Sequence, residues 1–254
     1  MSAATSSLEM YPVHQVPLTR PFIWLAQGWD DLLHHRGASL AYGALASGMG
    51  ALILAYDRNP IYVACAVVAF LFIGPIVTAG LCELSRARDH GEESNFQSSL
   101  LALRVNRRNL LPFAEVLGVM ALTWFVGAAG LLYLQSGSFS PSVTATVGGD
   151  VLRHLSEVQI FVYGLTLASL AVIVFAFSVV TVPMIIERHV DAKSAIRMSL
   201  RVVRLNFVAM VVWAGLICGL VMVGFATGLL AMVVIFPLLG HATWCAYRDL
   251  VEGH

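Results

Sequence analysis

Long apolar stretches dominate this chain and decide what it can fold into. A membrane-spanning helix needs about 20 predominantly apolar residues. Six windows of the sequence meet this requirement, at residues 39–57, 60–82, 112–134, 159–183, 207–225 and 226–246. Only 12% of the residues are charged, against about 25% in soluble domains. The sequence therefore predicts an all-α membrane protein, with a flexible cytoplasmic tail at residues 1–19 and a single six-span membrane domain at residues 20–254.

The positions of lysine and arginine predict how these spans are oriented. Positively charged residues accumulate in the cytoplasmic connections of membrane proteins. Of the 15 basic residues, all but Arg58 and Arg153 lie on one side of the predicted spans. We therefore expect both termini to be cytoplasmic. The 15 basic residues are balanced by 15 acidic ones, so the overall charge gives no reason to expect a nucleic-acid partner.

Three segments on the predicted cytoplasmic side have the periodicity of amphipathic helices. In each, apolar residues recur every three or four positions and polar residues recur at the same interval on an adjoining face. The apolar stripes are Phe22, Leu25, Trp29 and Leu32; Phe96, Leu100 and Leu103; and Ile196, Leu200, Val203 and Phe207. Each segment is predicted to lie at the membrane surface with its apolar stripe in the acyl boundary.

The polar faces of these segments differ in charge. The second and third segments carry basic stripes, which are candidate contacts for anionic lipids. They comprise Arg104, Arg107, Arg108, Lys193, Arg197, Arg201 and Arg204. The first segment has an acidic or neutral face instead, formed by Asp30, Asp31, His34 and His35. Recognition of anionic lipid and a solvated charged face packed on the bundle explain the basic stripes equally well, so both interpretations stay open.

An internal repeat underlies this pattern. The stretch LRVNRRN at residues 103–109 matches LRVVRLN at residues 200–206 in five of seven positions, and residues 29–35 can be laid on both by helix position and apolar pattern. Each even-numbered span also has a proline in its cytoplasmic half, at Pro75, Pro183 or Pro237. The repeat predicts three parallel units, each made of an interfacial amphipathic helix followed by a transmembrane hairpin.

Several charged residues near the cytoplasmic ends of the spans are candidate polar contacts. The predicted neighbouring pairs are Glu83 with Arg86, Glu187 with Arg188, and Arg248 with Asp249. Glu115 is the deepest plausible carboxylate, and Arg107 or Arg108 could pair with it. Charges at the edge of a bilayer are explained by helix-end pairing, whereas charges at its centre would indicate a functional site.

His241 and Cys245 lie one helical turn apart in the last span and raise the question of a metal or haem site. Structural zinc sites usually have four protein ligands, and this pair supplies two. The other seven histidines fall in predicted loops, tails or interfacial helices, so a monomer could not hold a haem between two histidines within the membrane. We therefore expect no metal and no cofactor. We expect His241 to make a polar contact with a backbone carbonyl or a charged helix end near cytoplasmic water.

Five stretches resemble a bacterial family of integral membrane proteins of unknown function, some of whose members carry a cytochrome c oxidase label. They are SLAYG at 39–43, GPIVTAGLCELSR at 74–86, LRVNRRN at 103–109, VPMIIERHVDAKSAIRMSLRVVRLN at 182–206 and FPLLGHATWCAYRDL at 236–250. The resemblance implies the fold and a membrane location, and it supplies no catalytic residue. A catalytic oxidase subunit would need several intramembrane histidines, whereas His241 alone lies in a predicted span.

Two classes of function follow. The first is a non-enzymatic, multi-pass protein of the bacterial inner membrane with an accessory, assembly or scaffolding role, for example in a respiratory complex, whose partners are membrane lipids and other membrane-protein subunits. The second is a small transporter or lipid-handling protein, in which prolines kink the even spans around a cavity. The positions of Glu115, His241 and the three prolines discriminate between them, because a transporter would gather these residues around one hydrated cavity.

Overall fold

The computed structural model describes residues 11–55, 74, 77–136 and 156–252, and every regular element in these ranges is a helix. The helices are α2 (Arg20–His34), α3 (Arg36–Ala55), α5 (Phe96–Ser136), α7 (Glu157–Ser178), α8 (Thr181–Arg188), α9 (Ala192–Leu205), α10 (Phe207–Ala226), α11 (Met232–Tyr247) and the π-helix η2 (Arg248–Glu252). Residues 77–89 are also helical. Most of the predicted span at 60–82 and most of the connection between the predicted spans at 112–134 and 159–183 lie outside the described residues.

Three stretches of the described chain are long and apolar enough to cross a membrane. They are Phe96–Gly127, Gly164–Arg188 and Phe207–Ala226. They correspond to the predicted third, fourth and fifth spans, and the chain is therefore an all-helical protein with helices suited to a membrane. The predicted first span, now α3, and the predicted sixth span, now the 16-residue α11, are not among them.

Two prolines interrupt the predicted spans in different ways. Pro112 lies inside α5, where the sequence predicts a boundary between an interfacial helix and a span; instead one helix of 41 residues runs through both. The predicted fourth span is broken between α7 and α8. Pro183 falls in the first turn of α8, where a backbone amide has no partner within the helix and a proline therefore costs no hydrogen bond.

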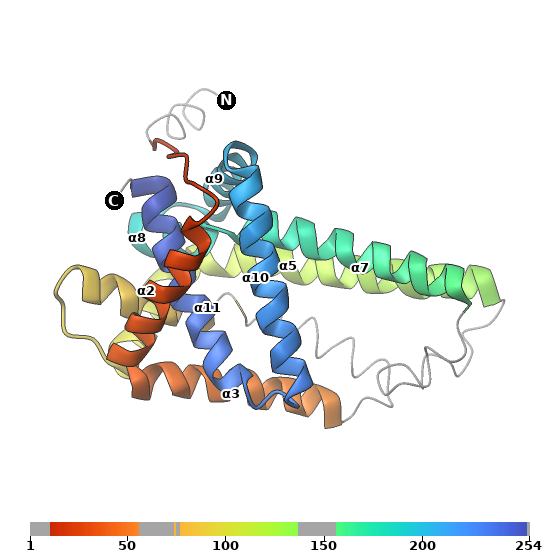
Figure 1. Ribbon diagram of the computed structural model, residues 1–254, viewed down its shortest axis with the longest axis horizontal. Coiled ribbons are helices and arrows are strands. Elements are labelled where there is room, and N and C mark those ends of the chain that lie inside the picture. The colour runs from red at the N-terminus through yellow and green to blue at the C-terminus, as the bar shows by residue number, and fades with distance from the viewer. Residues whose placement is uncertain (1–10, 56–73, 75–76, 137–155, 253–254) are drawn as a thin grey trace.

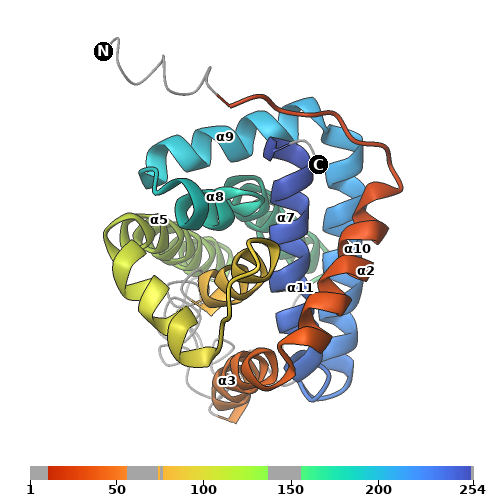
Figure 2. The same ribbon diagram turned by 90° about the vertical axis from the view of Figure 1, so that its left-hand side faces the viewer.

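The helices run in two main directions (Figures 1 and 2). α5 and α7 lie side by side and form an elongated arm, whereas α10 and α11 form a hairpin that runs crosswise to that arm. The hairpin turns at residues 227–231, slightly beyond the predicted boundary between the spans at 207–225 and 226–246, with positive φ angles at Gly228 and Leu229. Because α10 crosses the arm, the structure does not align these candidate spans as parallel members of one bundle.

Helices α2 and α3 pack closely against α11 because small residues lie at the crossings. A Cβ atom at Gly28 would lie 2.7 Å from the backbone nitrogen of Ala242, and one at Gly43 would lie 1.9 Å from the carbonyl oxygen of Val233. Glycine is therefore required at both positions for the observed helix separation. This close approach places α3, α11 and residues 77–89 around a common buried centre.

The residues before α2 are held against the protein. The backbone nitrogen of Val16 donates to Oδ1 of Asn206 at 2.9 Å, and Nδ2 of Asn206 donates to the carbonyl of His14 at 3.0 Å. The backbone nitrogen of His14 in turn donates to the carbonyl of Leu250. Residues 11–19, which the sequence assigns to a flexible tail, are thus bound to the end of α9 and to η2.

The face that α9 buries against the protein is different from the apolar stripe predicted to lie in the acyl boundary. On α9 the buried residues are Ala192, Ala195, Met198, Ser199 and Val202. The predicted apolar stripe lies beside this face, and two of its members, Leu200 and Phe207, are exposed. Small side chains on the buried face let α9 approach its neighbours closely, which an apolar pattern based on large residues cannot reveal.

Candidate functional site: a buried histidine network beside an open pocket

His241 lies in the interior of the protein and has partners at both ring nitrogens. Its side chain is fully buried, with Nε2 2.8 Å from Oγ of Ser39 and Nδ1 2.7 Å from Oγ of Ser85. Ser39 belongs to α3, and Ser85 belongs to the helical residues 77–89. The sequence predicts a carbonyl or a charged helix end as the partner of His241, whereas the structure provides two serine hydroxyls.

Asp31 extends this network and determines its direction. Its carboxylate accepts a hydrogen bond from Ser85 Oγ at 2.6 Å and another from Arg88 NH1 at 2.5 Å. Because the Ser85 hydroxyl hydrogen is used on Asp31, Ser85 Oγ accepts from Nδ1–H of His241. Nε2 is then the acceptor for the hydroxyl of Ser39. All donors in the chain therefore point toward Asp31, and His241 is a neutral imidazole protonated at Nδ1.

The position of Asp31 differs from the sequence prediction, which assigns it to an exposed polar face of the first amphipathic segment. Only 7% of the residue is exposed. Burial raises the pKa of Asp31, and the hydrogen bonds from Ser85 and Arg88 oppose that rise. The charge of Arg88 compensates the buried carboxylate, so the pair forms the charged end of an otherwise neutral chain.

The arrangement has the partners of a catalytic triad but lacks access for a substrate. A serine hydroxyl bonded to an imidazole, which is oriented in turn by a carboxylate, is the pattern that activates serine nucleophiles. Here Ser85 separates the imidazole from the carboxylate, and Ser39, Ser85 and His241 are all fully buried. The network therefore joins α2, α3, α11 and residues 77–89 through satisfied polar contacts.

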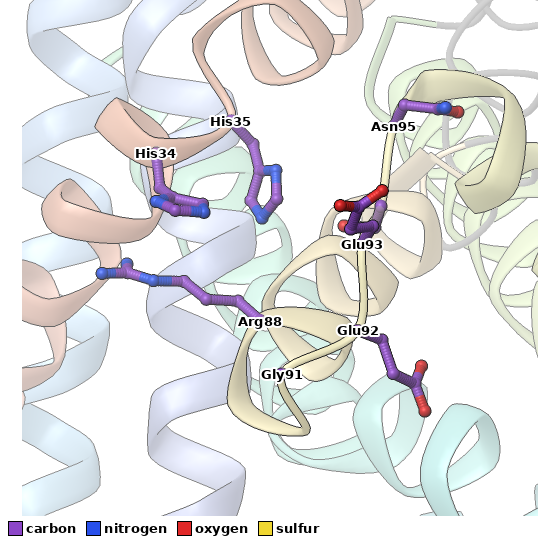
Figure 3. Close-up of a pocket in the computed structure, with 8 residues that line it drawn as sticks. His34, His35, Arg88, Gly91, Glu92, Glu93 and Asn95 are labelled. Carbon is purple, nitrogen blue, oxygen red and sulfur yellow. The ribbon is translucent and has the colours of Figure 1, made fainter.

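An open pocket is lined in part by Arg88, the residue that pairs with Asp31 at the end of the network (Figure 3). It has a volume of about 690 Å³ and is lined by His34, His35, Arg88, Gly91, Glu92, Glu93, Ser94 and Asn95. Nε2 of His35 is buried without a hydrogen-bond partner. Burial lowers the pKa of His35, and His34 and Arg88 lower it further, so its imidazole is neutral near pH 7.

The charged residues at the predicted cytoplasmic ends bind partners from distant parts of the chain. Oδ1 of Asp249 accepts from NH2 of Arg20 at 2.9 Å, and its other oxygen accepts from Nε1 of Trp24 at 2.6 Å. NH1 of Arg248 lies 2.6 Å from Asp89. Asp89 also accepts from Nε1 of Trp244 at 2.5 Å. These contacts tie both the start of α2 and the end of residues 77–89 to the C-terminal helices.

Two of the three predicted neighbouring ion pairs are replaced by other partners. Arg86 does pair with Glu83, at 2.8 Å, and it also binds Glu92. Arg188, however, pairs with Glu252 at 3.0 Å, and Glu187 lies 3.7 Å from the His90 ring. Adjacent residues on a helix point about 100° apart. The predictions of Glu187 with Arg188 and of Arg248 with Asp249 were therefore wrong for a geometric reason.

Glu115 and the basic stripes lie at the surface. Glu115 is exposed on α5, and within the described residues the structure has no ion pair between it and Arg107 or Arg108. The exposed basic residues are Arg104, Arg107 and Arg108 on α5, and Lys193, Arg197, Arg201 and Arg204 on α9. On α9 these basic residues are opposite the buried face, and the exposed apolar residue Leu200 lies between the two.

The cysteines do not extend the site into a metal centre in the part of the chain that the structure describes. Cys245 is buried one turn after His241, and Sγ of Cys82 is 3.8 Å from the carbonyl of Gly240. No group of three or more His, Cys, Asp and Glu side chains among the described residues could hold a metal ion. Burial among apolar neighbours explains both thiols as packing groups.

Helices of this length and apolarity, in a chain so poor in charged residues, define an integral membrane protein. The chain matches a family of unknown function whose model is described as "Predicted integral membrane protein (DUF2189)", over residues 62–187. This match confirms the resemblance found in the sequence. No curated protein and no solved structure matches the chain.

Proposed function

We propose that this protein is a non-enzymatic accessory, assembly or scaffolding component of the bacterial inner membrane. The observation that supports this role most directly is the separation of its two candidate transport residues. His241 is enclosed by serines in the interior, whereas Glu115 is exposed on α5. A transporter of this size would be expected to bring such groups to one hydrated cavity.

The described prolines support the same proposal because they serve separate helix contacts. Pro183 is buried in α8, and Pro237 is buried in α11 close to Gly43 of α3. Pro75 lies outside the described residues. Pro183 and Pro237 therefore lie at buried positions of separate helices, as expected for a rigid module that presents surfaces to partners.

The proposed topology has six crossings with both termini in the cytoplasm, and it rests on the distribution of lysine and arginine. In a bilayer it requires α5 and α7 to turn toward the direction of α10. Two interruptions lie on this arm, Pro112 inside α5 and the non-helical residues Val179 and Val180 between α7 and α8. A reporter enzyme that is active only in the periplasm tests this topology. It should be active when fused after residue 58 or after residue 148.

Anionic lipids are the proposed partners of the basic stripes. On α9, exposed apolar residues separate the protein-facing side from the basic side. A helix of this kind can insert the apolar residues into the acyl boundary while the cations remain among the headgroups. Each lysine or arginine near an anionic surface contributes about 1 kcal/mol to membrane affinity.

A pull-down of the full chain from membranes in mild detergent tests the accessory role. The oxidase label within the resembling family makes a respiratory complex the first partner to examine. Stable co-purification of respiratory subunits, with no haem absorption from the isolated polypeptide, is the expected result. A Soret band that follows the isolated polypeptide would overturn the non-enzymatic proposal, and substrate uptake by vesicles containing the protein alone would establish the transporter instead.

A further inference from the structure

One face of α5 carries two exposed charges of opposite sign. Arg108 and Glu115 lie two helical turns apart on this face, and both side chains are exposed. Neither residue forms an ion pair within the part of the chain that the structure describes. Both charges are therefore open to a partner from outside the molecule.

The exposed residues around these charges are arranged symmetrically. The centre of the face is formed by Leu111 and Pro112, which are both exposed. In each direction from this centre the face has a charged residue three positions away and an exposed leucine ten positions away. These residues are Arg108 and Leu101 on one side, and Glu115 and Leu122 on the other.

A face with this symmetry is complementary to itself. In a dimer with a two-fold axis the same patch of each copy meets the other, so that residue i contacts residue j and residue j contacts residue i. If the axis passes the centre of the face, Arg108 of each copy meets Glu115 of the other. Leu101 of each copy then meets Leu122 of the other. One contact thus forms two ion pairs and covers apolar residues at both ends.

The position of α5 in the molecule leaves this face accessible. Helix α5 packs against α7, α8 and α9, and its buried residues Phe113 and Leu117 lie on the side opposite the charges. Figure 2, which looks along the arm, shows α5 at one edge of the molecule, away from α10. A second copy can therefore approach α5 without displacing another helix of the described chain.

The length of α5 allows this contact between two copies in one membrane. Helix α5 has 41 residues and is therefore about 60 Å long, whereas a hydrocarbon core is about 30 Å thick. Such a helix can cross the core at a steep inclination, in keeping with its direction crosswise to α10 (Figure 1). Two inclined copies related by an axis along the membrane normal cross each other. Residues near the crossing point then meet in antiparallel order, while both copies keep the same topology.

We propose that α5 joins two copies of this protein in a dimer held by reciprocal ion pairs between Arg108 and Glu115. The pairing accounts for an exposed carboxylate on a helix that is long and apolar enough to cross a membrane, where an unpaired charge is costly. Arg104 and Arg107 are not needed for these pairs and stay available to anionic lipid. The dimer does not rest on the accessory role proposed above, because it requires no other protein.

Energy transfer between donor-labelled and acceptor-labelled copies of the full chain, in phosphatidylcholine vesicles, tests this contact. We expect transfer between wild-type copies. Arg108→Glu and Glu115→Arg should each weaken dimerisation about thirtyfold, because two attractive pairs become two repulsive ones. Arg107→Glu is the matched control and should leave the transfer unchanged, since Arg107 projects about 100° away from Arg108.

Two combinations of these substitutions separate the proposed pairing from a general effect of charge or misfolding. A mixture of the Arg108→Glu and Glu115→Arg proteins should regain transfer, because one copy then carries two carboxylates and the other two cations. A chain with both substitutions should dimerise with itself, because the charges are exchanged in both copies. The proposal is overturned if the wild type is monomeric, in which case lipid or another protein covers this face. It is also overturned if the single reversals leave the transfer unchanged, or if neither combination restores it.

Discussion

His241 and His35 both lie near Arg88, and their surroundings are very different. His241 is completely buried and both of its ring nitrogens are bonded. His35 lines an open pocket, and its buried Nε2 has no partner. Arg88 thus takes part in the closed network through Asp31 and also lines the open pocket.

This difference shows that burial of a histidine by itself does not indicate a functional site. Where helices approach closely, small hydroxyl side chains can satisfy both ring nitrogens, and the histidine then orders the helices around it. Where no such hydroxyl is present, as at Nε2 of His35, a buried nitrogen remains without a partner. The following predictions test the two sides of this comparison, beginning with the largest expected effect.

Gly43→Leu should open the closed side by pushing α3 away from α11. A side chain at this position overlaps the Val233 carbonyl, and we expect the variant to lose about 3 kcal/mol of unfolding free energy. Denaturant unfolding in detergent micelles would measure the loss. Gly48→Leu is the control, because nothing lies within 4 Å of a Cβ atom at Gly48. Equal stability of the two variants would contradict the close crossing.

His241→Leu should destabilise the protein by about 2–3 kcal/mol, because in a buried site the hydroxyl of Ser39 loses its acceptor and the oxygen of Ser85 loses its donor. His34→Leu alters an exposed histidine beside the pocket and should change stability by about 0.5 kcal/mol or less. Adding Ser39→Ala to His241→Leu should cost less than the sum of the single effects. Additive effects would mean that the two residues do not form one network.

Asn206→Ala should loosen the attachment of the segment before α2 to the end of α9, without unfolding the protein. It removes the contacts to His14 and Val16, which together should contribute about 1 kcal/mol. Hydrogen exchange is the appropriate measurement, and we expect the Val16 amide to exchange about five times faster than in the wild type. Asn109→Ala should leave that amide unchanged, since Asn109 binds His189 at a different junction.

The pH dependence of stability should report on the protonation of His35, which lines the open pocket. Because the pKa of His35 is lowered in the folded protein, the unfolded chain binds its proton first as the pH falls. Stability from this group is therefore complete above the unfolded pKa of about 6.5, and it is lost as the pH falls through the lower folded value. The wild type should lose more stability than His35→Asn between pH 7 and pH 5. Parallel pH profiles would exclude a buried neutral His35.

The sequence predicts elements well where one residue pattern is sufficient. The expected span at 207–225 is α10, Phe207–Ala226, and the third expected amphipathic segment, whose stripe begins at Ile196, is α9, Ala192–Leu205. Prediction failed where several local effects compete. The helix α5 continues through Pro112, whereas the chain breaks before Pro183, although both positions have the same residue type.

The candidate site was harder to predict than the helices. His241 was identified because a lone histidine in an apolar stretch is conspicuous, but its partners Ser39 and Ser85 carry no distinguishing pattern in the sequence. Asp31 has the position of a surface residue in its helix, and only the packing of residues 77–89 against α2 brings it to Ser85 and Arg88. One signal was available for His35, since the repeat aligns it with two asparagines.

The sequence by itself determined that the chain is helical and belongs in a membrane, because apolar length and scarcity of charge are local properties that survive any packing. The tertiary structure alone decided which buried polar groups have hydrogen-bond partners and which do not. That distinction depends on distances between residues about 50 to 200 positions apart, from Asp31 with Ser85 to Ser39 with His241. Such distances follow from how closely the helices cross, which the small residues at Gly28 and Gly43 allow but do not reveal in advance.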